Sequence, residues 1–408
     1  MNAKKLSIMH SAYFWIILSL LAFALLPSNA LDYGLFESTS DEYLEAMGWA
    51  SFNLTWAWFL PVIVYGALPL FRLPQQTQAK TELFLTALSV LFMLISATVC
   101  KISMGYSVLV LLVGYTALAT LSLAKLKVMQ GDKFIIASLL CIILLIFFFI
   151  VYPTLAIFVS MFYDGDTFAP QQVMRILTQS YIVRVITNSL FLSGFVGVVS
   201  TVFGLAFALY TTRIARRTAF IGKIFSILPI VTPPFVVGLG VTLMLGRSGY
   251  VTEFLSTNFG FTNHNWLYGF NGIAIAQILA FAPISFMILD GALKSVHPSI
   301  EEASYTLRAN RYQTFYNIIF PLLRPALANS FLIVFIQSLA DFSNPLVLGG
   351  SFDVIATQIY FYIAGSQLDY ASASTLGSIL LIFSLAIFII QYIYKAFAIT
   401  FLNSHIGN

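Results

Sequence analysis

Charged residues are scarce in this chain. Asp, Glu, Lys and Arg make up 9% of its 408 residues, whereas soluble globular domains carry about 25%. Hydrophobic residues make up 59%, and 39 of them are phenylalanines. This composition excludes a soluble globular protein and predicts an integral membrane protein in contact with lipid. The formal net charge of +4 is small and dispersed along the chain, which argues against nucleic-acid binding.

Residues that hold metals or perform catalysis are also few. The two cysteines, Cys100 and Cys141, do not form a metal-binding spacing, and the sequence leaves open whether they pair. The four histidines are scattered, so nothing indicates the cluster of a membrane enzyme. A GxxxxGK[ST] phosphate-binding loop is absent, because the Gly222-Lys223 pair lacks the preceding glycine. We therefore predict no catalytic residue and no cofactor, and assign no metal site.

Ten apolar segments are long enough to cross a bilayer, since a helical span needs about 20 mostly apolar residues. They cover residues 11–27, 53–71, 82–99, 106–123, 134–159, 185–210, 224–245, 267–289, 327–348 and 375–397. With a cytoplasmic N-terminus, 16 of the 20 Lys and Arg residues fall on the inner side, as the positive-inside rule requires. The first segment also resembles a signal peptide, but we favour an uncleaved span. The sequence thus predicts an all-α polytopic membrane protein with both termini cytoplasmic.

A basic, glycine-containing turn at residues 125–133 divides the chain into two blocks. Residues 1–133 hold four spans with short connections, and residues 134–408 hold six spans with longer connections. Small residues recur at every fourth position of the sixth span, on one helix face: Ser189, Ser193, Gly197 and Thr201. Small side chains at this spacing allow helices to approach closely in lipid.

Two spans of the second block contain candidate residues for a translocation path. Pro233 and Pro234 interrupt the seventh span. Proline lacks the N–H that would pair with a carbonyl group one turn earlier, and lipid cannot replace it. Such a helix must be covered by neighbours or line an aqueous path. Asp341 and Asn344 lie near the outer end of the ninth span. A carboxylate there is a functional candidate, although it suits a helix cap equally well. No other acidic residue is expected deep in a span, which argues against an ion-coupled secondary transporter.

A polar, helix-prone segment, residues 290–326, connects the eighth and ninth spans on the inner side. Ser299 and Glu302 have the spacing of a capping box, which predicts the start of a helix. We expect a turn and then a second helix that ends at Pro321. So long a polar structure between two spans indicates a surface for a partner.

This segment resembles the EAA motif of binding-protein-dependent ABC importer permeases. In that motif Glu-Ala-Ala is followed after three residues by Gly, and after nine more by Ile, one residue, an apolar residue and Pro. Glu302-Ala303-Ser304 matches its start, and Pro321 its end. Arg308 stands where the motif has Gly. Glycine adopts a positive φ freely, whereas Arg adopts it at a cost in conformational energy. The alternative is a turn at the following Ala-Asn pair, since Asn tolerates that conformation.

The resemblance implies a type I ABC importer permease core of six helices in a bacterial inner membrane, preceded by four extra N-terminal helices. It implies that this segment binds a groove in a separate ATP-binding subunit dimer and that a solute-binding protein delivers the substrate. The residues implied in ATPase coupling are Glu301, Glu302, Ala303, Ser304, Leu307, Arg308, Ala309, Arg311 and Pro321.

Residues 340–360 are similar to iron(III)-type permeases, which implies iron(III) as the substrate and leaves phosphorylated sugars, phosphonates and thiamine open. We interpret Asp353 and Asp369 as solvated carboxylates of an outer loop rather than as an iron site. Many iron-type permeases fuse two halves, each with its own motif, whereas one motif is found here. A second copy, another chain or the remainder of a longer protein would then supply the second half.

Overall fold

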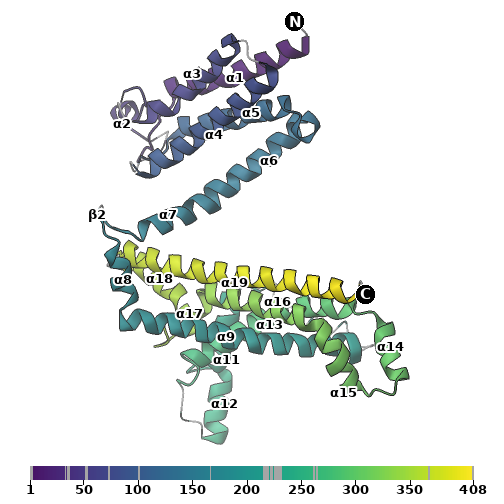
Figure 1. The fold of residues 1–408 in the computed structure, drawn as a ribbon. Coiled ribbons are helices and arrows are strands. Elements are labelled where there is room, and N and C mark those ends of the chain that lie inside the picture. The colour runs from purple at the N-terminus through teal and green to yellow at the C-terminus, as the bar shows by residue number, and fades with distance from the viewer. Residues whose placement is uncertain are drawn as a thin grey trace. The chain divides into compact units, whose positions relative to one another are not determined.

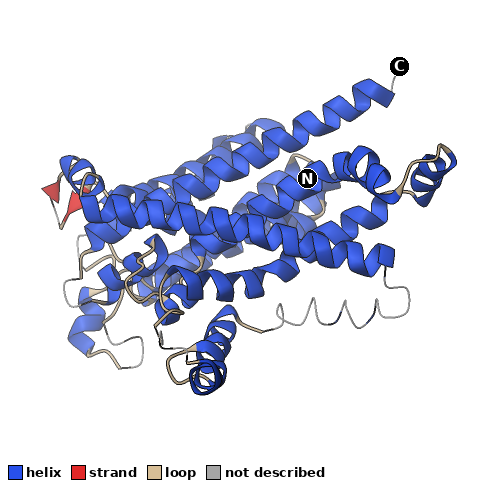
Figure 2. Ribbon diagram, turned by 90° about the horizontal axis from the view of Figure 1, so that it is seen from below, coloured by secondary structure: helices blue, strands red, loops and turns tan. Residues whose placement is uncertain are grey.

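The computed structural model describes most of the chain, and its elements are almost all helices (Figure 1; Figure 2). The described residues are 3–32, 34, 37–50, 54–71, 74–99, 102–165, 167–214, 220, 224, 232–260, 262, 265–365 and 368–406. They form two compact units, Met1–Ala156 and Ile157–Asn408. This division falls later than the boundary predicted at 133/134, because the helix that begins at Lys133 packs on the helix before it.

The first unit is a bundle of apolar helices. Its elements are α1 (Ala3–Leu25), α2 (Ser40–Glu45), η1 (Leu54–Trp58), α3 (Leu60–Ala67), η2 (Leu68–Phe71), α4 (Gln75–Val99), α5 (Tyr106–Lys125), η3 (Val128–Gly131), α6 (Lys133–Ile146), η4 (Phe147–Val151) and the start of α7 (Tyr152–Ser160). Trp58, Val62 and Leu111 are fully enclosed in its core. Cys141 is a free, exposed thiol of α6, whereas Cys100 lies outside the described residues.

A buried ion pair lies inside this unit, where the sequence predicted none. Because α4 begins at Gln75, Glu82 lies two turns inside the helix and is only 1% exposed. The Lys125 ammonium, in the last turn of α5, donates to both Glu82 carboxylate oxygens at 2.7 and 2.8 Å. The hydroxyl groups of Ser122 and Tyr65 also donate to the Glu82 carboxylate, at 2.9 and 3.2 Å. The expectation that no acidic residue besides Asp341 lies deep in a span is therefore wrong.

The second unit is a helical bundle with a small hairpin at one end. Its elements are β1 (Tyr163–Asp164), β2 (Thr167–Phe168), α8 (Gln171–Leu177), α9 (Ser180–Leu209), η5 (Tyr210–Ile214), α11 (Pro234–Leu245), α12 (Tyr250–Phe259), α13 (Phe270–Ser295), α14 (Pro298–Thr306), α15 (Arg311–Thr314), η6 (Phe315–Ile319), α16 (Phe320–Ala340), α17 (Ser343–Leu348), α18 (Ile355–Ala364) and α19 (Tyr370–Ile406). The strands pair antiparallel, Tyr163 with Phe168 and Asp164 with Thr167.

Eight helices in the described residues are long and apolar enough to cross a membrane. They overlap eight of the ten predicted spans, and the first two predicted spans fall on the shorter apolar helices Ala12–Leu25 and Thr55–Ala67. The seventh predicted span, 224–245, falls partly outside the described residues. The apolar helical stretch that overlaps it begins at Pro234 and continues through α12 to Phe259.

Helices α9, α13 and α16 pack together as the centre of the second unit (Figure 1). The predicted small-residue face of α9 is buried: Ser189, Ser193, Gly197 and Thr201 all lie inside. A Cβ atom on Gly197 would come within 2.9 Å of the Phe331 ring, so this close approach requires glycine. Near the other end of α9, Ala208 packs with Leu289, Leu293 and Leu323 in a separate apolar cluster. That cluster supports the segment between α13 and α16.

Candidate coupling site

Helix α14 begins two residues earlier than a Ser299 cap would place it. His297 is the N-cap, and its Nδ1 accepts from the Ser299 backbone N–H at 3.4 Å. Pro298 occupies the first helical position, where its fixed φ and missing N–H favour a helix start. The predicted capping box of Ser299 and Glu302 is therefore wrong, because Ser299 already lies inside the helix and its hydroxyl bonds His297 instead.

Helix α14 ends in a Schellman motif centred on Arg308. The Ala309 N–H donates to the Ser304 carbonyl at 3.1 Å, and the Arg308 N–H donates to the Tyr305 carbonyl at 3.0 Å. Arg308 has a φ of 64°, so it adopts the left-handed conformation that the family motif reserves for glycine. Asn310 has a φ of −79°, and the alternative turn at Ala309-Asn310 is wrong.

The helix after this turn continues into the membrane span. Asn310 is the N-cap of α15 and forms a capping box with Gln313. The π-helical turn η6 then joins α15 to α16, and Pro321 lies in the first turn of α16. The expectation that the second helix ends at Pro321 is wrong. A π-turn shifts the backbone hydrogen bonds by one residue, which accommodates a proline in a continuous helix from Arg311 to Ala340.

Two buried hydroxyl groups join the helices on either side of the turn. The Ser304 and Thr314 hydroxyl oxygens lie 2.8 Å apart, and both side chains are buried. Each hydroxyl group has a single proton, so one of them donates across the turn to the other. The hydroxyl that accepts there donates within its own helix, Ser304 to the Glu301 carbonyl at 2.7 Å or Thr314 to the Asn310 carbonyl at 3.1 Å. These bonds satisfy both hydroxyl groups and hold α14 against α15, so the two helices form one unit.

An ion pair connects α14 to α9. The Arg213 guanidinium, in the π-helical turn η5 at the end of α9, pairs with the Glu301 carboxylate. The same guanidinium donates to the Leu293 carbonyl of α13 at 3.4 Å. Glu301 is the more buried partner, with 13% of its side chain exposed against 27% for Arg213. Glu301 thus points toward the bundle, whereas Glu302 is exposed.

The outer face of this segment carries exposed apolar and aromatic side chains. Leu307 is 84% exposed and Tyr312 is 70% exposed. The rings of Tyr312 and Tyr316 lie 5.1 Å apart, and Tyr305 and Ile300 extend the same exposed set. The remaining predicted coupling residues Ala303, Arg308 and Arg311 are exposed, and Ala309 is half-buried. Aromatic and aliphatic side chains at this exposure, next to arginines, are typical of a surface that a partner covers.

Of the four predicted path residues, two come together in a buried polar network. The Asp341 carboxylate accepts from the Asn344 and Gln277 side-chain amides at 2.7 and 2.9 Å, and from the Ser343 backbone N–H at 3.0 Å. Asp341 therefore ends α16 and binds the first backbone N–H of α17, whose N-cap is Phe342. A Cβ atom on Gly238 of α11 would lie 2.7 Å from the Asn344 Oδ1 atom. Pro233 and Pro234, at the start of α11, are exposed instead.

Sequence reasoning missed Arg213, Thr314 and Gln277. Gln277 is fully buried in α13, and its polarity inside an apolar span was a usable signal. Arg213 and Thr314 offered no such signal, because a span end and a polar segment are ordinary places for them. Among the described residues, no group of three or more His, Cys, Asp and Glu side chains is placed to hold a metal ion.

The comparisons with known proteins agree with this geometry. The family described as "Binding-protein-dependent transport system inner membrane component" matches residues 200–398. The match includes the Arg213–Glu301 pair and residues 298–319, from α14 to η6, which are called the coupling segment below. The chain carries a domain of this family. The chain is 97% identical over 348 residues to FbpB 1 of Haemophilus influenzae, whose name assigns it to ferric transport as a permease. That match covers 85% of this chain and 55% of the relative.

Two further comparisons bear on identity and fold. The ferric transport system permease protein FbpB of Actinobacillus pleuropneumoniae is 81% identical over 391 residues, which cover 96% of this chain and 57% of that protein. The chain thus spans little more than half the length of these two relatives. A solved bacterial ABC transporter that imports alginate matches with a TM-score of 0.57 at 20% identity, covering 66% of this chain and 96% of that one. The chain therefore has the ABC importer permease fold and is a multi-pass inner-membrane protein.

Proposed function

We propose that the chain is a permease subunit of an ATP-driven importer, that a separate ATP-binding subunit dimer hydrolyses the ATP, and that a soluble binding protein delivers the substrate. The observation that carries this proposal is the coupling segment. It exposes Leu307 and Tyr312 to a partner, and it is joined to two spans through Arg213 and Thr314. A similar solved transporter was captured with its periplasmic protein bound to substrate, which supports the second partner.

In this proposal the residues implied in coupling have two roles. Leu307, Tyr312 and the exposed arginines form the surface that the ATP-binding subunit covers. Glu301 and Ser304 face the bundle and transmit the movement of α14 to α9 and α16. Arg213 lies in the π-helical turn η5, and Thr314 directly precedes the π-helical turn η6. Such turns mark places where helices bend or rearrange.

We propose ferric iron as the substrate, because both relatives that match most of this chain are named for ferric transport. Iron is cargo here, and phosphorylated sugars, phosphonates or thiamine are the alternatives that a transport assay would distinguish. A second permease half completes the pathway, either from the remainder of a longer protein, from another chain or from a second copy. Pro233, Pro234, Asp341 and Asn344 remain proposed path residues.

The direct test is co-purification with the ATP-binding subunit after co-expression of the transport system. Leu307→Asp places a charge at the centre of the exposed surface, and we expect the subunit to be lost from the complex. Tyr250→Asp is the matched control, because Tyr250 is 78% exposed on α12, outside the coupling segment. Full retention of the ATP-binding subunit on Leu307→Asp, with binding equal to that of the control, would refute the coupling role.

A further inference from the structure

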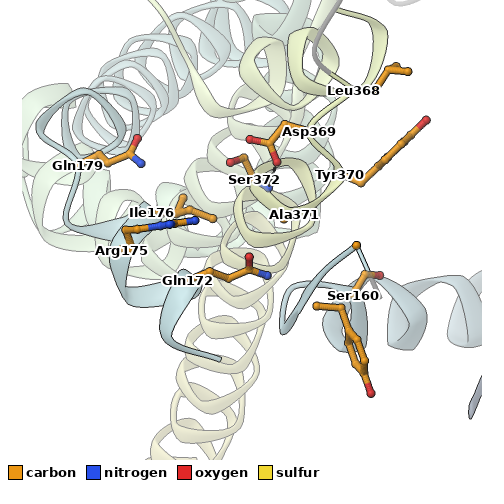
Figure 3. Close-up of a pocket in the computed structure, with 12 residues that line it drawn as sticks. Ser160, Gln172, Arg175, Ile176, Gln179, Leu368, Asp369, Tyr370, Ala371 and Ser372 are labelled. Atoms are coloured by element: carbon orange, nitrogen blue, oxygen red, sulfur yellow. Dashed lines mark hydrogen bonds between the residues drawn. The ribbon is translucent and has the colours of Figure 1, made fainter. Parts of the chain in front are cut away.

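A polar cavity of about 640 Å³ lies in the second unit. Helix α8 supplies Gln172 and Arg175, and Gln179 is the N-cap of α9. Asp369, just before α19, and Ser372 in its first turn also line the cavity, and the end of α7 with the β-hairpin closes the remaining side (Figure 3). In Figure 1, α8 and α14 lie at opposite ends of the second unit. The cavity is therefore far from the coupling segment and has no part in the contacts described above.

The charged side chains around this cavity differ in whether they already have hydrogen-bond partners. Asp369 is already used, because its carboxylate accepts from the Ser372 backbone N–H at 2.9 Å and caps α19. Gln172 donates from its amide to the Met161 carbonyl at 3.2 Å. The Arg175 guanidinium extends toward the cavity (Figure 3), and within the described part of the chain it has neither an ion pair nor a hydrogen bond. An unengaged guanidinium with amide groups beside it matches a carboxylate, which it binds through two parallel N–H···O bonds.

The position of the cavity decides which carboxylate can reach it. Arg213 lies at the coupling end of the span Ser180–Arg213, and α8 directly precedes its other end. A helix of 34 residues is about 50 Å long, which exceeds the roughly 40–45 Å of a bilayer with its headgroup layers. With α14 on the cytoplasmic side, α8 lies at the opposite membrane surface, where a soluble protein has access.

We propose that this cavity is a docking socket for the soluble binding protein, in which Arg175 binds an Asp or Glu side chain of that protein and Gln179 adds a hydrogen bond. The inference rests on the proposed function, because it takes its partner from there. A charge pair at the rim of an interface accelerates encounter and makes binding depend on salt. Arg175 would therefore set the rate and salt dependence of docking without touching the transported substrate.

The test is binding of the cognate binding protein to the complete transporter in lipid nanodiscs, measured over a range of salt concentrations. We expect Arg175→Gln to weaken binding about tenfold at low salt and to flatten its salt dependence, and Arg175→Lys to restore part of it. Arg184→Gln is the matched control, since it removes the same charge from the exposed start of α9 without lining the cavity. It should bind like wild type.

The possible outcomes distinguish failure of the docking socket from failure of the proposed function. Equal binding by wild type and Arg175→Gln, or equal losses in Arg175→Gln and Arg184→Gln, would overturn the socket and leave the proposed function standing. A loss confined to nanodiscs with anionic lipid would assign the cavity to a lipid phosphate and also overturn it. Failure of the wild-type transporter itself to bind the protein would contradict the proposed function.

Discussion

Arg213 and Glu301 form an ion pair that joins the end of span α9 to the first turn of the coupling helix α14. The pair lies between two helices that are separated by almost ninety residues of sequence, and Arg213 also holds the end of α13 through the Leu293 carbonyl. A displacement of α14 must therefore move α9 or break this pair. Glu301 is thus the glutamate of this segment that contacts the bundle, whereas Glu302 is exposed.

Removing one member of this pair should uncouple ATP hydrolysis from transport. Glu301→Gln or Arg213→Gln leaves a partly buried charge without its partner, which costs about 1–2 kcal/mol after allowance for solvent exposure, or about 5- to 30-fold in coupling. We expect ATP hydrolysis to continue while the stimulation by binding protein falls. The measurement is the ratio of stimulated to basal ATP hydrolysis in the reconstituted transporter.

The exchange Arg213→Glu with Glu301→Arg controls for general damage. The two charges exchange places and still attract each other. The ratio of stimulated to basal ATP hydrolysis should therefore exceed that of Arg213→Glu alone and of Glu301→Arg alone. Glu253→Gln is the control, because Glu253 is exposed on α12, outside the coupling segment, and should leave the ratio unchanged. A double variant whose ratio does not exceed that of both single charge reversals would show that the pair does not transmit movement.

Arg308 should tolerate glycine and resist branched residues. Its φ of 64° costs a non-glycine residue about 1–2 kcal/mol, and Arg308→Gly removes this strain at a similar entropic cost in the unfolded chain. We expect Arg308→Gly to keep the apparent Tm within a few degrees, and Arg308→Val to lower stability by about 1–3 kcal/mol. Arg311→Val is the control, since Arg311 begins an ordinary helix and is exposed. Similar Tm values for Arg308→Val and Arg311→Val would show that the turn carries no strain.

Gly238 should not accept a methyl group, whereas Gly240 on the same helix should. A Cβ atom at Gly238 would meet the Asn344 Oδ1 atom at 2.7 Å, and nothing lies within 4 Å of one at Gly240. Separating α11 from α17 to relieve this clash costs about 1–3 kcal/mol. Thermal unfolding in detergent should show a lower Tm for Gly238→Ala and an unchanged or higher Tm for Gly240→Ala. The opposite order would contradict the packing of α11 on the Asp341 network.

The Glu82–Lys125 pair should stabilise the first unit only as a pair. Glu82→Gln leaves the Lys125 ammonium without its buried partner, which costs about 3–5 kcal/mol. Lys125→Met alone should be similarly harmful, and the combination Glu82→Leu with Lys125→Met should recover much of the loss because no charge remains buried. Protease resistance of the first unit measures this. Single variants as resistant as wild type would show that the pair is not structural.

Span positions were predictable because apolar length and Lys/Arg distribution both act over many residues. Local geometry was less predictable, because single residues decide it. Helix α14 begins at Pro298, because proline favours the first helical position. The second helix continues beyond Pro321, because a π-helical turn precedes this proline. Glu82 was predicted at the edge of a span because the first turns of α4 are polar and lack the apolar composition of a span. The ion pair of Arg213 joins residues remote in sequence, and no local pattern reports such a contact.

ATP-dependent uptake of ferric iron tests the central claim most directly. The complete transporter, with second half, ATP-binding subunits and binding protein, is reconstituted into vesicles with ATP on the cytoplasmic side. The account predicts iron accumulation that requires both ATP and the binding protein and is abolished by Leu307→Asp. Accumulation driven by an ion gradient without ATP, or ATP-driven accumulation that Leu307→Asp leaves intact, would contradict it.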